Sequence, residues 1–261
     1  MGGKSVNKEP LFVEATALLI PSYQDSDDFA DLIDHYIRHV PTFAPTCWGA
    51  EEPLVIPYQP VRRRAFLRKG SQDLMWRRVG KGAGEGRFQR QVRAIQGNQH
   101  AFHWFSVCSY SASDVDEIIR YLQLLSQAMG TEYAFCDSLV DAYKPQAVRN
   151  GFAPHGLLNI FTHRLRRCMP DIAWGQIFGP AYVALFGMEK LLSVPAYLVK
   201  EISPTSVYIQ LSPSLYDVRH DYAAVEEARQ AVKAHLDDNV FFDPRHPPDH
   251  VYRTPRFQFS R

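Results

Sequence analysis

The 261-residue chain lacks long apolar runs, paired cysteines and an excess of charge of one sign. No segment approaches the roughly 18 apolar residues that a membrane-spanning helix needs, and the N-terminus holds no apolar core of a signal peptide. The four cysteines form no CxxC pair, which favours reduced thiols over a disulfide framework or a zinc site. The net charge of +1 provides no general attraction to nucleic acid or to membranes. A cytoplasmic protein without a membrane partner is expected.

A phosphate-binding loop of the usual kind is also missing. Residues 80–87 are rich in glycine, but a P-loop follows the pattern GxxxxGK[ST], which brings a lysine and a hydroxyl together at the start of a helix. Here Lys81 comes early in the stretch, and no serine or threonine follows it. We interpret these residues as a hairpin tip or a disordered loop.

Side chains that could carry catalysis or bind metal form no recognisable set. His100 and His103 are spaced too closely to place both imidazoles on one face of a strand, so packed or surface histidines are favoured. Cys47 or Cys136 could be a nucleophile, but no local signature marks a histidine partner. We therefore expect no enzymatic activity, no cofactor and no metal. A hydrolase that uses either cysteine is the least favoured alternative.

Strand-like and helix-like segments alternate along the chain. Helical periodicity follows each of three strands and begins near a serine or aspartate that can cap a helix. This order predicts the α+β class, with a mixed, largely antiparallel sheet and amphipathic helices on one face. We expect one domain, residues 1–261, with two similar halves at 11–100 and 101–245. The strand–helix pairs are 11–20 with 26–40 (capped by Ser26), 101–110 with 113–130 (capped by Ser113), and a strand ending at 212 with 221–236.

The densest apolar run of the sequence extends from Pro170 to Pro213. Gly179-Pro180 can open a short helix, because proline in the first turn gives up only an unpaired amide, and Gly187 can end it. Residues 196–202 and 206–212 alternate between apolar and polar side chains, which predicts a hairpin. This run is interpreted as scaffold. Residues 246–261 are predicted to form an extended tail.

Basic residues concentrate in segment 62–93, which we call the basic arm. It holds eleven lysines and arginines against two acidic residues, so its charge is about +9 and that of the remainder about −8. Phe66, Trp76 and Phe88 interleave with the arginines and could stack on bases, so a nucleic-acid-binding module is the alternative function. The same charges can pair with the protein's own acidic residues, which makes nucleic acid the less favoured partner. The candidate basic surface comprises Arg63, Arg68, Arg77, Arg78 and Arg87.

Acidic residues concentrate on one side of the first predicted helix. Asp27 and Asp28 complement the helix dipole in its first turn, but Asp31 and Asp34 lie beyond the reach of that effect. Most charged faces are merely solvated, so a binding role for this one is a hypothesis. We call the full set, extended onto the second helix, the acidic face: Asp27, Asp28, Asp31, Asp34, Asp114 and Glu117.

Several motifs follow one another in a distinctive order, mainly in the C-terminal third. They are Pro45–Gly49 after an amphipathic helix, Ala173–Gly187, Leu191–Tyr197, Val207–Leu211, Val232–Leu236 and Phe241–Pro244. In these motifs the chain resembles the immunity proteins of bacterial polymorphic toxin systems, specifically the immunity protein 52 family. The resemblance covers roughly residues 11–252, and the basic arm looks like a local elaboration.

The resemblance implies an α+β protein without enzymatic activity that binds and neutralises a cognate toxin. In that family the partner is commonly a nuclease with the restriction-endonuclease fold, often delivered by a type VI secretion system. Such a nuclease presents cationic groups where DNA would lie, so an acidic protein surface can compete for its groove. The family contributes no binding residues, and the acidic face stays the candidate toxin-binding surface on grounds of charge alone.

Overall fold

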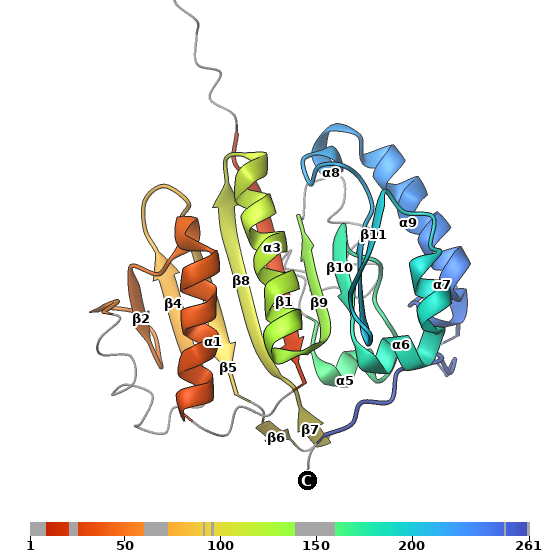
Figure 1. The fold of residues 1–261 in the computed structure, drawn as a ribbon, viewed down its shortest axis with the longest axis horizontal. Coiled ribbons are helices and arrows are strands. Elements are labelled where there is room, and N and C mark those ends of the chain that lie inside the picture. The colour runs from red at the N-terminus through yellow and green to blue at the C-terminus, as the bar shows by residue number, and fades with distance from the viewer. Residues whose placement is uncertain are drawn as a thin grey trace, which may run out of the picture.

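The computed structural model describes residues 9–20, 26–59, 73–90, 92–94, 97–138, 160–247 and 249–259. Ten of the described strands form one sheet, in the order β11-β12-β10-β9-β1-β8-β5-β4-β2-β3, and β6 pairs with β7 (Figure 1). The strands are β1 (Leu11–Leu19), β2 (Cys47–Gly49), β3 (Ile56–Pro57), β4 (Asp73–Arg78), β5 (Gly84–Gln89), β6 (Val92–Ala94), β7 (Gly97–Gln99), β8 (Ala101–Ser109), β9 (Thr131–Asp137), β10 (Gly175–Phe178), β11 (Leu198–Ser203) and β12 (Ser206–Gln210). The helices are α1 (Ser26–His39), α3 (Ala112–Met129), α5 (Thr162–Leu165), α6 (Pro180–Phe186), α7 (Met188–Leu192), α8 (Asp217–His220) and α9 (Tyr222–Leu236), with the 3-10 turns η1 (Pro41–Phe43) and η3 (Asp238–Val240).

Strand β1 lies at the centre of the sheet. It pairs antiparallel with β8 on one side and with β9 on the other, and all other pairings in the ten-stranded sheet are antiparallel as well. The predicted α+β class with a largely antiparallel sheet is confirmed. Strands from both predicted halves, 11–100 and 101–245, join in this one sheet. The duplication of the halves stays a prediction.

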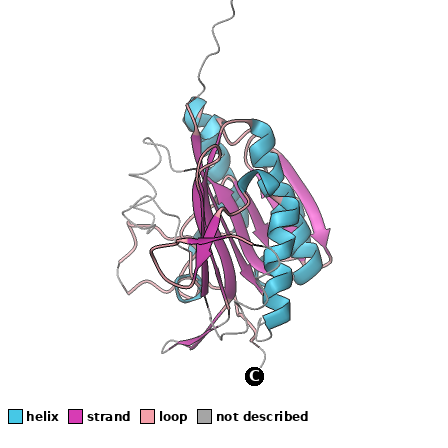
Figure 2. Cartoon of the chain, turned by 90° about the vertical axis from the view of Figure 1, so that its left-hand side faces the viewer, coloured by secondary structure: helices cyan, strands magenta, loops and turns pink. Residues whose placement is uncertain are grey.

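Helices α1 and α3 lie side by side on one face of the sheet (Figure 1), and Figure 2 shows helices packed along one side of most of the strands. The predicted apolar stripe of α1 is buried there, with Phe29, Leu32 and Tyr36 at 1% exposure or less. The Tyr36 ring lies 5.3 Å from Trp76 and 4.6 Å from His103, and its hydroxyl donates to the carbonyl of Phe43 at 3.1 Å. Tertiary packing of an amphipathic face therefore fixes α1, as its period predicts.

The helices are not confined to that face, which differs from the prediction in this respect. A Cβ at Gly175 of β10 would lie 3.1 Å from Ile119 of α3, so this position faces α3. Its neighbour Gln176 points the opposite way because side chains alternate along a strand, and it accepts from Tyr133. The Tyr133 ring packs 5.7 Å from Tyr182 of α6. The half of the sheet formed by β9, β10 and β12 is thus covered on both sides.

Local sequence signals located most helix ends. Helix α6 begins at Pro180, and Gly187 ends it with a φ of +89°, as predicted. Helix α3 ends at Gly130, but its N-cap is Ser111 and not Ser113. Ser111 forms a capping box with Asp114, which satisfies two backbone amides at once and outcompetes the later serine. In the glycine-rich stretch 80–87, residues 80–83 form a hairpin tip, with φ of +92° at Gly80, and residues 84–87 belong to β5.

Among the described glycines, Gly179 is the one at which an added side chain would clash most severely with the backbone. A Cβ there would lie 1.9 Å from the carbonyl oxygen of Thr131 and 2.8 Å from the Glu132 backbone. Gly179→Ala should therefore lower the free energy of unfolding by about 3 kcal/mol or more, because backbone must move. Gly80→Ala is the matched control, since nothing lies within 4 Å of its Cβ and its left-handed backbone costs only about 1 kcal/mol. Urea denaturation of both variants measures the difference, and equal losses would contradict the expectation.

Candidate functional site

The acidic face is only partly available on the surface. The side chains of Asp27 and Asp28 lie outside the described residues. On α1, Asp31 is exposed and Asp34 is half-buried. The two helices that carry the face do lie side by side, as its extension onto α3 requires. A role for this face in binding stays a prediction.

The two members on α3 have structural partners. Asp114 accepts the backbone amides of Tyr110 and Ser111 at 2.8 and 3.1 Å, which fixes the start of α3. Glu117 accepts the amide and the hydroxyl of Thr42 at 2.9 and 2.8 Å. Since Thr42 lies in the turn after α1, Glu117 ties the two helices together. Among the four members whose side chains are described, Asp31 is therefore the most accessible to a partner.

Three arginines in the described part of the basic arm bind groups within the protein. Arg77 lies 3.1 Å from Glu52 and 3.6 Å from Glu85, and Arg87 binds both oxygens of Asp73 at 2.7 and 3.3 Å. Arg78 donates to the carbonyls of Ala44 and Lys81 at 2.8 and 3.0 Å. Arg63 and Arg68 lie outside the described residues. Nothing in the described part of the arm favours nucleic acid over this internal pairing.

Both histidines singled out in the sequence are buried in the packed interior. Nδ1 of His100 lies 2.8 Å from the hydroxyl of Thr162, and Nδ1 of His103 lies 2.7 Å from the hydroxyl of Tyr121. Burial lowers the pKa of each, that of His100 to about 3, so both are neutral at physiological pH. No cluster of three or more histidine, cysteine or acidic side chains suited to a metal occurs among the described residues.

The cysteine suggested as a nucleophile on β9 lacks the environment of one. Cys136 is fully buried, and burial raises the pKa of its thiol well above the usual value. A catalytic cysteine needs the opposite shift, because the thiolate is the reactive form. Cys47 is half-buried and its thiol lies 3.7 Å from the carbonyl of Arg77.

No described helix has the length and apolar composition needed to cross a membrane.

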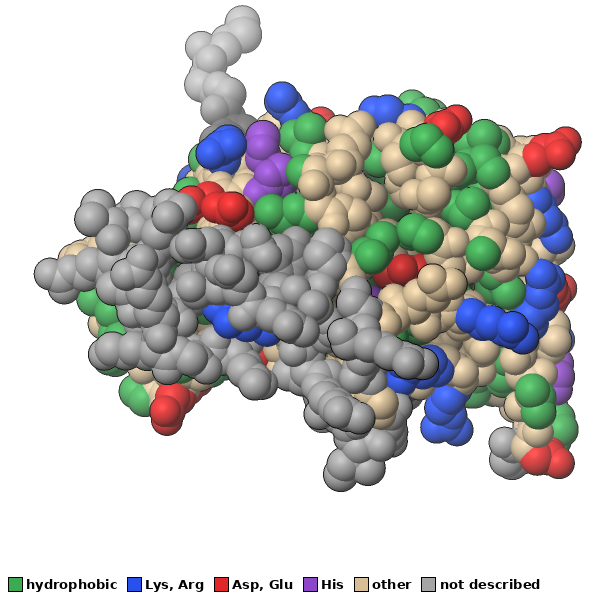
Figure 3. Space-filling view, turned by 60° about the horizontal axis from the view of Figure 1, so that its bottom comes forward, with side chains coloured by type: hydrophobic (Ala, Val, Ile, Leu, Met, Phe, Trp, Pro, Cys, Tyr) green, Lys and Arg blue, Asp and Glu red, His purple; other side chains and the backbone are tan. Residues whose placement is uncertain are grey.

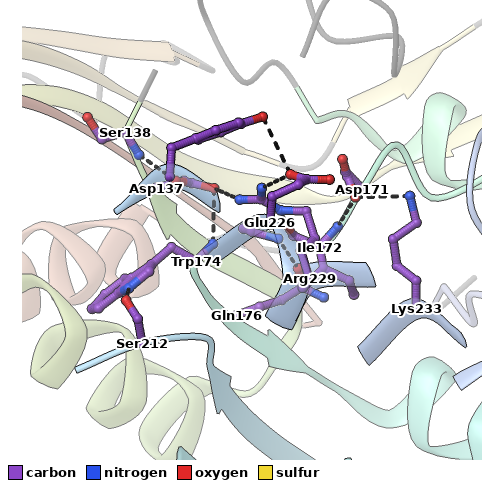
Figure 4. Close-up of polar contacts among 12 residues, drawn as sticks. Asp137, Ser138, Asp171, Ile172, Trp174, Gln176, Ser212, Glu226, Arg229 and Lys233 are labelled. Carbon is purple, nitrogen blue, oxygen red and sulfur yellow. Dashed lines mark hydrogen bonds and ion pairs between the residues drawn. The ribbon is translucent and has the colours of Figure 1, made fainter. Parts of the chain in front are cut away.

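The most concentrated polar site is a buried ion cluster around Arg229 of α9 (Figure 4). Arg229 is completely buried and donates to the Ile172 carbonyl and to Glu226, both at 2.7 Å. Its guanidinium also lies 3.7 Å from Asp137, at the end of β9. Asp137 in turn accepts the backbone amides of Ser138 and Trp174 at 2.7 and 3.0 Å. The cluster thus joins α9, β9 and the segment that leads into β10.

A second pair lies beside this cluster. Lys233, one turn further along α9, lies 3.2 Å from Asp171, whose side chain is completely buried. Arg229, Asp137 and Asp171 are completely enclosed, whereas the side chains of their partners Glu226 and Lys233 are partly exposed. The paired charges hold these elements together. Burial raises the pKa of Asp137 to about 6, although Arg229 and the two amides oppose that shift. The cluster is a structural site with one titratable member near neutral pH.

Sequence reasoning missed this cluster, although one signal pointed to it. Arg229 occupies a place in the apolar stripe of α9, four residues after Val225 and three before Val232, both of which are buried. A charged residue in such a stripe must find a buried partner. The partner could not be identified from sequence, because Asp137 is remote in the chain and on a strand that periodicity did not reveal.

The comparisons with known proteins show a fold that this chain shares with a solved structure. No family model and no curated protein matches the chain, so membership of the immunity protein 52 family stays a hypothesis. The solved structure of a Pseudomonas aeruginosa T6SS protein, PA0821, matches with a TM-score of 0.53 over 94% of this chain and 79% of that chain, at 13% identity. A second match is the toxic C-terminal tip of CdiA from Pseudomonas aeruginosa in complex with an immune protein, at 8% identity over 52% of this chain and 90% of that chain. Its TM-score of 0.27 is too low to support an argument.

The raised pKa of Asp137 predicts how the free energy of unfolding depends on pH. Because the folded value of about 6 exceeds the usual value near 4, protonation favours the folded state. The contribution of Asp137 to the free energy of unfolding is fully present below pH 4 and is lost as the pH rises through 6. The free energy of unfolding of the wild type, minus that of Asp137→Asn, should rise by about 1 kcal/mol between pH 7 and pH 5. Paired urea titrations at the two values measure it.

Asp243→Asn is the control for that experiment. Arg245 lowers the pKa of Asp243, so this carboxyl stays ionised over the same range. The corresponding difference for Asp243→Asn should be flat between pH 7 and pH 5. A flat result for Asp137→Asn as well would mean that its pKa is not raised.

Proposed function

We propose that this protein is a non-enzymatic immunity protein that binds and neutralises a cognate secreted toxin. The observation that carries the proposal is the fold shared with a T6SS protein over 94% of the chain, which fits a role in the same kind of secretion system. The sequence resemblance to immunity proteins agrees with it. The immunity protein 52 family is the specific assignment that we favour.

The chemistry of the described residues supports a role in binding. The histidines singled out in the sequence are buried and neutral, burial holds the Cys136 thiol protonated, and Asp114 accepts backbone amides. Cys47 is half-buried. These contacts stabilise the fold, which supports surface recognition as the mode of action. A protein that acts by occupying another protein's surface needs no more than that.

The favoured partner is a nuclease toxin with the restriction-endonuclease fold, met in the cytoplasm where it reaches DNA. The DNA-binding groove of such a toxin carries cationic side chains. An acidic surface associates with this groove rapidly because opposite charges steer the encounter. Asp31 and Asp34 of α1 supply such a surface. Asp27 and Asp28 precede them on the same helix and extend the predicted surface.

The test is reconstitution with the toxin encoded beside this protein's gene. We expect coexpression to protect cells from the toxin, and the purified pair to form a stable complex that abolishes toxin activity. Activity should return when the complex is dissociated, because a non-enzymatic inhibitor leaves the toxin chemically unchanged. Toxin that stays inactive after separation would point to an enzymatic mechanism, and absence of both protection and a complex would refute the proposal.

The acidic face predicts a specific loss of affinity. Asp31→Lys combined with Asp34→Lys should weaken toxin binding at least about tenfold, mainly through slower association at low salt. Asp31→Lys alone guards against misfolding, because Asp34 is half-buried. Glu189→Lys with Glu227→Lys is the matched control, since it makes the same charge change at exposed positions of α7 and α9. Calorimetry that finds wild-type affinity in the folded double variant would exclude this face.

A further inference from the structure

A large cleft opens at the end of the molecule that carries α5. Its volume is about 760 Å³. One wall is the turn that contains α5 and continues to Pro170, and the other consists of residues 242–247 and 250–254. Figure 3 looks onto this end of the molecule and shows lysine and arginine side chains gathered beside the undescribed atoms. Neither the ion cluster nor the acidic face contributes to the cleft.

The first wall is strongly cationic. It carries Arg164, Arg166 and Arg167 within four consecutive residues, and His163 precedes them. Arg164 is half-buried and Arg167 is exposed, and neither has a carboxylate partner among the described residues. Burial, together with the neighbouring charge of Arg167, lowers the pKa of Arg164. Cations held this closely repel one another, so an anion placed between them would be stabilised.

The opposite wall cannot supply that anion. Asp243 is the carboxylate in this wall, and Arg245 binds both of its oxygens at 2.6 to 3.0 Å. That pairing lowers the pKa of Asp243 and leaves its charge satisfied. The Tyr252 hydroxyl accepts the Asp243 amide at 3.0 Å, which braces the segment. Among its described residues, the cleft therefore keeps an excess of positive charge in a protein whose net charge is only +1.

Apolar and aromatic surface lies next to these cations. Phe242, Val251, Tyr252 and the prolines at 170, 244 and 247 line the cleft. The rings of His246 and His250 stack at 3.9 Å along the same wall. A simple inorganic ion would use the guanidinium groups and leave this surface uncovered. A chain that alternates acidic and apolar side chains would use both.

We propose that the cleft binds an acidic segment of a partner protein, with carboxylates on Arg164 and Arg167 and apolar side chains against Phe242 and Val251. Guanidinium groups bind carboxylates in a two-pronged geometry that gives both affinity and orientation. The segment belongs to the toxin, so the identity of the partner rests on the proposed function. The cleft is then a second contact, opposite in charge to the acidic face.

Nucleic acid fits the cleft less well. A phosphate backbone is followed by cations spread along a groove, whereas the arginines of this wall are grouped in one short turn. The other wall carries ion pairs, Asp243 with Arg245 and, nearby, Asp237 with Arg253 at 3.0 Å. Their carboxylates would repel a second run of phosphates.

The test uses the full-length protein and a short fluorescein-labelled peptide in which glutamate alternates with leucine, measured by fluorescence anisotropy at low salt. We expect binding that weakens at least about tenfold in Arg164→Glu with Arg167→Glu. The matched control is Arg38→Glu with Arg120→Glu, which reverses two exposed arginines on α1 and α3 and should bind as the wild type does. Circular dichroism confirms that both variants are folded.

Three competing probes decide between the alternatives. The same peptide with glutamine in place of glutamate should not bind, and inorganic phosphate should not displace the acidic peptide at similar concentrations. Tighter binding of a single-stranded oligonucleotide at this site, displacement by phosphate, or no peptide binding at all would overturn the inference. These measurements need no toxin. The inference about the cleft can therefore be refuted while the proposed neutralisation of a toxin is supported, and the reverse is also possible.

Discussion

The permanent charge of Arg229 is the constraint on which one side of the structure depends. A guanidinium stays protonated under all physiological conditions, and this one is completely enclosed. Removing one partner of a buried pair typically costs about 3–5 kcal/mol, so Asp137, Glu226 and the Ile172 carbonyl must all stay in place. Because they come from β9, α9 and the segment before β10, the cluster fixes how these elements meet.

Local signals in the sequence were sufficient to predict the helices and the hairpin that have a clear periodicity and a cap or turn. Helices α1, α3 and α9 have an apolar stripe of helical period and a residue that ends or caps them, and the β11–β12 hairpin has a partial period-two pattern around a short turn. Strands β9 and β10 were missed because every residue in them is buried, so no alternation marks them. The placement of β1 between β8 and β9 depends on contacts remote in sequence, which no local pattern encodes.

The candidate surface was predicted less well than the fold, for a related reason. Charge patterning identified the acidic residues but could not distinguish a carboxylate in solvent from one with a partner. Asp114 accepts backbone amides of its own helix start, which a capping box at Ser111 could have indicated. Glu117 binds Thr42 across two helices, and nothing in the sequence brings those residues together. Asp31 makes no comparable contact among the described residues, and its side chain is exposed to solvent.

Near-neutral composition conceals surfaces of opposite sign. Attraction between solvated charges fades over a Debye length of about 10 Å, so an approaching protein responds to the charges of one surface and not to the net charge of +1. The exposed Asp31 on α1 and the arginines Arg164 and Arg167, which have no carboxylate partner among the described residues, present opposite charges in different parts of the fold. A partner with a cationic groove and an acidic segment at matching positions can satisfy both at once. A partner with only one of them is repelled at the other surface, so two contacts of opposite charge discriminate better than one large surface of a single sign.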